Sequence, residues 1–339
     1  MTFDGHEGSG REPGSSRPEG RFRMLCCLGR GGMAEVFLAL AQGPGGVERL
    51  VVLKRLRPDL AHDASFRAML VDEARVAARL HHENVVHTYD EQDEQGLFLV
   101  MEYLEGQPLS RLFREAADRN EPLGAGIAAF IAHEVLAGLH HAHSLEDFDG
   151  TPLHIVHRDV SPHNVFVTHD GQVKIVDFGI AKAVLSATVT EVGVLKGKAA
   201  YMAPECVLAE ATDARADVFS VGIVLWELLT MQRLYAGHAS ATLHRILTEP
   251  PPELGPTSDP RLAAVVARAL AKEPDDRFGS ARAMQEALAA AAPTPWSEAR
   301  GALAARMKRY FQEDRERARE VVRAARRAPQ VPSSGRGLP

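Results

Sequence analysis

Residues 154–182 constrain most strongly what this chain can fold into. Two short runs of β-forming residues, 165–167 and 173–176, are separated by the pair Asp170-Gly171. An Asp-Gly pair between two apolar runs is a strong signal for a tight turn, so the pattern predicts a hairpin.

Three polar residues flank this hairpin. Asp159 and Asn164 precede the first run, and Asp177 follows the second. A hairpin brings Asn164 and Asp177 to the same end, where two oxygen ligands can hold Mg²⁺, a cation that completes its shell with phosphate and water. Asp159, in the adjacent loop, can orient an incoming hydroxyl and accept its proton.

The order His157-Arg158-Asp159, then Asn164, then Asp177-Phe178-Gly179 resembles the catalytic core of the protein kinase family. Either tripeptide alone is more often ordinary turn chemistry. Both together, in this order and with Asn five residues after the first Asp, form a specific signal. The segment 31–36 further resembles bacterial eukaryotic-type (Hanks-type) serine/threonine kinases.

This resemblance covers 21–292 and implies an α+β, bilobal protein-kinase-like fold. We expect a small β-rich N-lobe with one key helix (21–103) and a larger, mostly helical C-lobe (104–292). Residues 1–20 are rich in Gly, Ser, Pro and charge, which predicts a disordered arm. The remaining part, 293–339, is predicted to be a basic, Ala-rich helix followed by a disordered tail.

Composition excludes several other classes of protein. The formal net charge of −6 gives no reason to expect nucleic acid as a partner. Three cysteines, two of them adjacent, argue against a disulfide framework and fit a reducing compartment. The most apolar run, 218–229, is too short to span a bilayer, and there is no signal peptide, so we expect a cytoplasmic protein.

A glycine-rich segment, 28–36, lies between two apolar runs. Glycines let backbone N–H groups approach phosphate oxygens, although alone the pattern fits an ordinary hairpin loop equally well. It resembles the phosphate-covering loop of kinases, with Gly32 extra and Ala34 replacing a third glycine. The resemblance implies ATP and Mg²⁺ as cofactors. Residues implied to contact ATP are Leu28, Gly29, Gly31, Gly32, Val36, Val52, Lys54, Met101, Glu102, Leu104 and Phe166.

Lys54 ends the apolar run 51–54 and matches the kinase lysine that contacts the α- and β-phosphates. Without that context it would be a lysine extending from an edge strand. In the following segment, 64–80, apolar residues recur with helical spacing and Glu73 falls on their face. A carboxylate there is costly unless paired, so we expect Glu73 to pair with Lys54.

The segment 97–106 resembles the kinase hinge, whose backbone binds adenine. The resemblance implies that Met101 is the gatekeeper and that Glu102 and Leu104 supply backbone contacts. A plain core strand followed by a turn would satisfy the side chains equally well. In the same way Asp217 is expected to anchor the catalytic loop.

Several remaining features are expected to be structural or regulatory. Arg277 matches the structural partner of Glu205, and His157 is expected to support the catalytic loop. Clustered histidines near 140–143 fit a helix C-terminus better than a metal site. Hydroxyls in 183–200, which resembles the activation segment, are candidate phosphorylation sites whose phosphate would pair with Arg158. These hydroxyls are Ser186, Thr188 and Thr190.

Two positions depart from the serine/threonine kinase pattern. Ser161 stands where a lysine is usual, and Lys198 stands where a threonine is usual. We hypothesise that Lys198 supplies the missing catalytic charge; the alternative is independent drift with a weakened enzyme. Losing one charge-stabilising donor costs on the order of a hundred- to a thousandfold in rate, which slows an enzyme without silencing it.

We therefore expect an ATP-dependent kinase that phosphorylates Ser/Thr hydroxyls of protein substrates and autophosphorylates its activation segment. The alternatives are a pseudokinase acting as a nucleotide-gated binding module, favoured by Ser161, and a small-molecule kinase. The segment 201–205 argues against the latter because it resembles a platform for protein substrates. The basic helix near the C-terminus can mediate self-association or bind a partner, but a solvated helix is the favoured interpretation.

Overall fold

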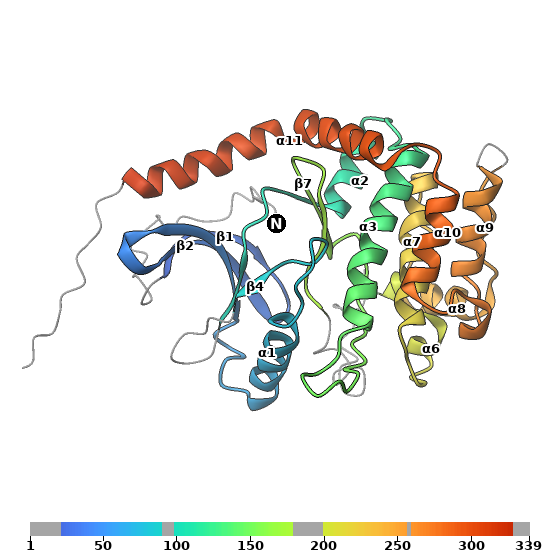
Figure 1. The fold of residues 1–339 in the computed structure, drawn as a ribbon, viewed down its shortest axis with the longest axis horizontal. Helices are drawn as coiled ribbons and strands as arrows, with labels where there is room; N and C mark the ends of the chain where they lie inside the picture. The colour runs from blue at the N-terminus through green and yellow to red at the C-terminus, as the bar shows by residue number, and fades with distance from the viewer. Residues whose placement is uncertain (1–21, 90–97, 179–198, 256–258, 328–339) are drawn as a thin grey trace, which may run out of the picture.

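The computed structural model describes residues 22–89, 98–178, 199–255 and 259–327. They form a β-rich lobe and a larger helical lobe that meet along the connection near residue 104 (Figure 1). The predicted α+β bilobal architecture is thereby confirmed.

The N-terminal lobe is built on a five-stranded antiparallel sheet. Its strands lie in the order β1 (Phe22–Arg30), β2 (Ala34–Gln42), β3 (Glu48–Leu56), β5 (Phe98–Glu102) and β4 (Thr88–Tyr89). The centre of β3 is fully buried, as expected for a Val/Leu run covered on both faces.

One helix, α1 (Ala64–Ala77), packs against this sheet. Asp63 caps its N-terminus by accepting a hydrogen bond from the Ser65 backbone N–H at 2.8 Å. The apolar spacing suggested a helix up to Leu80, but α1 ends at Ala77. Its buried residues are Met69, Leu70 and Glu73. The position of Glu73 on the buried face confirms the expectation drawn from spacing.

A second, three-stranded sheet lies where the two lobes meet. It has the antiparallel order β6 (Gly106–Pro108), β7 (Val165–Thr168) and β8 (Val173–Ile175), which confirms the predicted hairpin. Gly171 adopts φ 79°, the left-handed conformation that the tight turn requires. Gly106 lies so close to the Val167 carbonyl that a Cβ there would overlap it.

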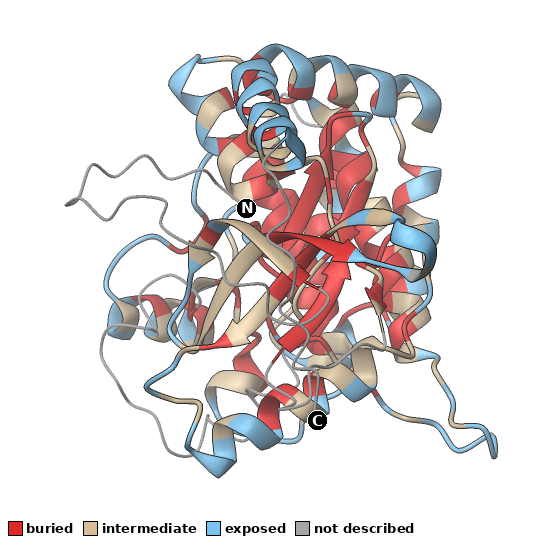
Figure 2. Cartoon of the chain, turned by 90° about the vertical axis from the view of Figure 1, so that its left-hand side faces the viewer, coloured by how far each residue is buried: buried red, intermediate tan, exposed pale blue. Residues whose placement is uncertain are grey.

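The C-terminal lobe packs its helices around α3. Eleven of the 19 residues of α3 and 13 of the 16 residues of α7 are buried, because both helices are rich in Ala, Val, Leu and Ile. Figure 2 shows the buried residues concentrated in the sheets and facing elements, with exposed residues on outer helix faces. The helices are α2 (Leu109–Asp118), α3 (Ala125–His143), α6 (Pro204–Val207), α7 (Arg215–Thr230), α8 (Ala239–Thr248), α9 (Pro260–Ala269) and α10 (Ala281–Ala290). Short 3₁₀ turns occupy Pro44–Gly46, Ala199–Tyr201 and Pro274–Asp276.

The last helix, α11 (Trp296–Arg327), corrects one expectation. We expected a solvated helix, but Leu303, Met307 and Phe311 are at most 1% exposed within the core of the C-terminal lobe. They are spaced four residues apart and so form one apolar stripe, which the high Arg and Glu content of the helix obscured. Within the described part of the chain, no helix combines the length and apolar character that crossing a membrane requires.

Candidate active site

Lys54 connects the two lobes at the centre of the site. Its Nζ lies 2.5 Å from Glu73 Oε1 and 3.0 Å from Asp177 Oδ1. The predicted pair between Lys54 and Glu73 is present in the structure. Burial disfavours the charge on Lys54, but Asp177 and Glu73 outweigh it and raise the pKa of the lysine above its usual value. The ammonium group therefore stays charged and ties α1 to the loop after β8.

The side chain of Asp217, at the start of α7, anchors the loop that carries Asp159. This fully buried carboxylate accepts hydrogen bonds from the backbone N–H groups of His157 and Arg158, both at 2.8 Å. Arg158 adopts φ 61°, a left-handed conformation that costs energy for a non-glycine residue. The two hydrogen bonds to Asp217 help to offset this cost and stabilise this conformation of the loop.

His143 is a partner of Asp217 that sequence reasoning missed. Its Nε2 lies 2.8 Å from Asp217 Oδ2. Burial alone would raise the pKa of Asp217, but the contacts with His143 and His157 outweigh burial and lower this pKa below its usual value. The available signal was a histidine at a predicted helix C-terminus together with an acid predicted to anchor the catalytic loop; the helix terminus alone was sufficient to explain the histidine. Within the described residues, no group of three potential metal ligands is present.

Asp159 and Asn164 lie side by side. Asn164 Nδ2 donates to Asp159 Oδ2 at 2.6 Å and to the Asp159 carbonyl at 2.9 Å. The amide nitrogen thereby positions the acid, and the amide oxygen of Asn164 is the atom left for a cation.

Asn164 and Asp177 lie at the same end of the β7–β8 hairpin, as predicted. The backbone N–H of Val176 donates to the Asn164 carbonyl at 2.9 Å, which continues the ladder between the strands. The Asp177 side chain remains 41% exposed. A carboxylate and an amide oxygen form the hard donor set that suits Mg²⁺, so the residues present fit that ion.

Six apolar residues that are expected to contact ATP belong to one apolar cluster. Five are buried members and Val36 packs against them, although they come from β1, β2, β3, β5, the connection after β5, and β7. The members are Leu28, Val36, Val52, Met101, Leu104 and Phe166. Such a cluster provides an apolar surface against which a planar ring can pack.

The polar members of the predicted nucleotide set lie around this cluster. The Gly31 backbone N–H donates to the Ala34 carbonyl at 2.8 Å and closes the turn between β1 and β2, which contains Gly32 and follows Gly29. The Glu102 carboxylate accepts from Lys174 Nζ at 2.6 Å, so its side chain is occupied within the protein. This ion pair was not predicted, because its partners are far apart in sequence.

Glu205 and Arg277 form the predicted structural pair. Both guanidinium Nη atoms lie 2.7 Å from the carboxylate oxygens, in a bidentate arrangement, and the Arg277 side chain is 0% exposed. Arg277 also donates to the carbonyls of Ala271 and Lys272 at 2.8 Å. The pair fixes the segment that contains Glu205 to the helical core.

Some expectations concern residues outside those that the structure describes, namely Gly179, Lys198, Ser186, Thr188 and Thr190. Ser161 is described and is 2% exposed. Among the described residues its hydroxyl has no hydrogen-bond partner.

The chain resembles known proteins over most of its length. The family model for the protein kinase domain matches residues 22–289. The tyrosine-protein kinase MasK of Myxococcus xanthus is 40% identical over 277 residues, which cover 80% of this chain and 43% of that protein. The serine/threonine-protein kinase PknA of Mycobacterium tuberculosis is 35% identical over 286 residues, covering 80% and 61% of the two chains.

A solved structure, the PknI kinase domain of Mycobacterium tuberculosis, superposes with a TM-score of 0.59 at 29% identity, covering 81% of this chain and 96% of that one. The chain spans about half the length of the curated relatives it matches. From the match over 22–289, and from the geometry that places Lys54, Glu73, Asp159, Asn164 and Asp177 around one site, the chain belongs to the protein kinase family.

Proposed function

We propose that this chain is an ATP-dependent protein kinase that phosphorylates serine and threonine hydroxyls of protein substrates. The observation that carries the proposal is the contact of Lys54 with both Glu73 and Asp177, beside the hydrogen-bonded pair of Asp159 and Asn164. Relatives named serine/threonine-protein kinases, such as PknA of Mycobacterium tuberculosis and PksC of Streptomyces coelicolor, support this class of activity.

In this proposal the reaction depends on positioning and electrostatics. Lys54 neutralises charge on the phosphates, and Glu73 keeps its ammonium group in place. Asn164 and Asp177 would hold Mg²⁺, which when bound neutralises the charge that develops during transfer. Asp159 orients the substrate hydroxyl and accepts its proton, and the amide of Asn164 fixes the rotamer of Asp159.

The nucleotide base would lie against the apolar cluster that includes Leu28, Val52, Met101 and Phe166. The backbones of Glu102 and Leu104 supply its hydrogen bonds. The backbones of Gly29, Gly31 and Gly32 cover the phosphates, since glycine allows close approach of N–H groups. Three free thiols fit a reducing compartment and so support a cytoplasmic location.

Incubation with labelled Mg·ATP and a generic protein substrate tests the proposal. We expect labelled protein from the wild type and loss of label in Asp159→Asn. Asp118→Asn, which alters an exposed carboxylate at the end of α2, serves as the matched control and should keep full activity. Tight nucleotide binding without transfer in the wild type would instead support a pseudokinase, and transfer only to small molecules would support the other alternative.

A second candidate concerns the acceptor hydroxyl. MasK, 40% identical to this chain, is named a tyrosine-protein kinase, and Ser161 departs from the serine/threonine pattern. Acid hydrolysis of the labelled product separates the two possibilities. Phosphoserine and phosphothreonine would support the first proposal, whereas phosphotyrosine would support the second.

We also propose that Lys198 compensates for the lysine replaced by Ser161, and that the activation segment is autophosphorylated on Ser186, Thr188 or Thr190. Lys198→Ala should reduce turnover on the order of a hundredfold, the usual cost of losing one charge-stabilising donor. The double swap Ser161→Lys/Lys198→Thr should restore it. Unchanged turnover in the single variant would contradict the compensation.

Mass spectrometry of peptides from 183–200, after incubation of the protein with ATP, tests the autophosphorylation. Unmodified peptides would contradict it.

A further inference from the structure

The second half of α11, residues 312–327 (the strap), lies outside the matched kinase domain, 22–289. In Figure 1 it leaves the helical lobe and extends over the β-rich lobe, so that α11 spans both. The helix is interrupted at Phe311, which has non-helical torsions (φ −125°, ψ 23°). The strap therefore begins at a defined joint.

This joint is fixed to the C-terminal lobe. Phe311 is 1% exposed, within the core of that lobe, and the guanidinium of Arg111 from α2 lies 5.2 Å from its ring centroid. Asp314, also buried, forms an ion pair with the same Arg111 at 2.8 Å. The hydroxyl of Tyr310 donates to Glu121 at 2.7 Å. Three different side chains make these contacts, so the start of the strap is attached to the C-terminal lobe.

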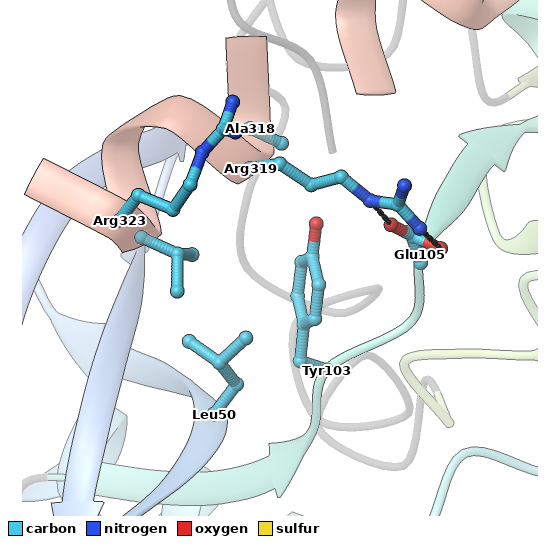
Figure 3. Close-up of a pocket in the computed structure, with 7 residues that line it drawn as sticks. Leu50, Tyr103, Glu105, Ala318, Arg319 and Arg323 are labelled. Carbon is cyan, nitrogen blue, oxygen red and sulfur yellow. Dashed lines mark hydrogen bonds and ion pairs between the residues drawn. The ribbon is translucent and has the colours of Figure 1, made fainter. Parts of the chain in front are cut away.

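The strap holds Glu105, the residue directly after Leu104. Arg315 Nη2 lies 2.7 Å from Glu105 Oε2. Arg319 Nε lies 2.9 Å from Glu105 Oε1, a contact that Figure 3 shows. Burial disfavours the charged carboxylate, but both arginines outweigh it and lower the pKa of Glu105 below its usual value. The Glu105 carbonyl also accepts from the His169 N–H at 2.9 Å. Glu105 is thus held through both its side chain and its backbone.

Further along, the strap reaches the N-terminal lobe. Val322 packs against the apolar cluster that contains Leu28, Val52 and Met101, and Arg326 lies 3.6 Å from Glu48 at the start of β3. A cavity of about 360 Å³ lies beneath it, lined in part by Leu50 and Tyr103 (Figure 3). Beyond Arg319, a cavity separates part of the strap from the N-terminal lobe, whereas Arg315 and Arg319 contact Glu105 directly.

We infer that Arg315 and Arg319 are positioning residues for the nucleotide, acting through Glu105 on the backbone of Leu104. The inference rests on the proposed function, in which that backbone binds adenine. Half-exposed ion pairs contribute little to folding stability. Two of them on one carboxylate next to Leu104 instead restrict the conformations of that segment, and a preordered segment binds its ligand at a lower entropic cost.

The test is the double variant Arg315→Gln/Arg319→Gln in the full chain. We expect the KM for ATP to rise roughly threefold to tenfold, the factor that two such pairs can supply, with kcat changed by less than about twofold. The Kd for a fluorescent ADP analogue should rise by the same factor. The matched control, Lys308→Gln/Arg327→Gln, removes two exposed charges from α11 that have no ion pair among the described residues. It should leave KM and Kd unchanged.

A coupling experiment separates positioning from a general effect. Glu105→Gln should raise KM by a similar factor, and combining it with the double variant should add little, because all three residues act through one contact. A double variant with reduced melting temperature but wild-type KM and Kd would show a purely structural role and overturn the inference. Additive effects of Glu105→Gln and the double variant would also overturn it. Nucleotide binding without phosphoryl transfer in the wild type would contradict the proposed function alone, since the Kd measurement still tests the strap.

Discussion

Two carboxylates in this protein are each bound by arginine, but in different surroundings. Glu205 meets Arg277 inside the C-terminal lobe, where their side chains are 6% and 0% exposed. Glu105 meets Arg315 and Arg319 beside the connection between the lobes, where the three side chains are 33%, 29% and 55% exposed. Both contacts pair a glutamate with arginine, so differences in their effects on stability can be attributed to the difference in burial.

A buried pair cannot lose one partner without leaving an unpaired charge away from water, so it fixes a scaffold. A half-exposed pair can exchange its partners for water at little cost, so it can influence local geometry without determining whether the chain folds. The pair of Lys54 and Glu73, with side chains 14% and 9% exposed, lies between these extremes. The comparison therefore predicts a graded series of effects on stability.

The largest effect is expected for Arg277→Ala. Removing the guanidinium leaves Glu205 buried and unpaired, which should lower the free energy of unfolding by about 3–5 kcal/mol. Urea unfolding followed by circular dichroism measures this loss. Arg282→Ala, which breaks an exposed pair with Glu286 on α10, is the control and should cost less than about 0.5 kcal/mol. Equal effects of the two substitutions would contradict the role assigned to burial.

The next effect is expected for Asp217→Asn, and it should depend on pH. The pKa of Asp217 is lowered in the folded protein, so its charged form contributes stability above the unfolded value of about 3.9, and this contribution is lost as pH falls through the lower folded value. At pH 7 the substitution should cost about 1.5–3 kcal/mol, the usual contribution of hydrogen bonds to a charged group.

Urea unfolding at several pH values between 7 and 3 would measure this dependence. The difference between wild type and Asp217→Asn should narrow only below about pH 4, because that is where the unfolded carboxylate becomes protonated. Asp118→Asn, at an exposed position, should show little difference from wild type at pH 7. A difference that stays constant down to pH 3 would show that the charge of Asp217 is not what stabilises the loop.

Glu73→Gln should lower the free energy of unfolding less than Asp217→Asn does, and should lower catalytic activity more. Lys54 keeps Asp177 as a partner at 3.0 Å, so the free energy of unfolding should fall by less than about 1.5 kcal/mol. Losing the charge-assisted bond that places Lys54 should lower kcat/KM roughly 10- to 100-fold. Steady-state kinetics with varied ATP checks this, and wild-type kcat/KM in the variant would contradict the position of Glu73 in the site.

The smallest effect is expected for Arg326→Ala. Its ion pair with Glu48 is 3.6 Å long, and its side chain is 55% exposed. We expect a change in unfolding free energy below about 0.5 kcal/mol, the range of exposed pairs. The KM for ATP should stay at the wild-type value, in contrast to the Arg315/Arg319 variant. A raised KM here would show that the whole strap, rather than its grip on Glu105, affects the nucleotide.

The sequence allowed much of the fold and site to be predicted, because the decisive signals are local. An Asp-Gly pair between two apolar runs indicated the β7–β8 hairpin and, through it, the meeting of Asn164 and Asp177. A carboxylate on an apolar helical face indicated that Glu73 needs a cation. The geometry of a tight turn leaves few other structures for the first segment, and the free-energy cost of burying an unpaired carboxylate requires a partner for the second.

Contacts between residues far apart in sequence could not be predicted in this way. Arg315 and Arg319 follow Glu105 by 210 and 214 positions, and nothing around either partner marks it for the other. Composition made α11 resemble a solvated helix, although its apolar stripe through Leu303 and Met307 was present in the sequence. The division of the chain at residue 292 stays a prediction.

The short connection between the sheets has a consequence for motion. Strand β5 ends at Glu102, and β6 starts at Gly106, whose backbone is pressed against β7. Because Glu105 is held by Arg315, Arg319 and His169, rotation of one lobe against the other along this connection must be absorbed mainly by the torsions of Tyr103 and Leu104. If a purine forms hydrogen bonds with that same backbone, its affinity and the opening angle are thermodynamically linked, and each must shift the other by the same free energy.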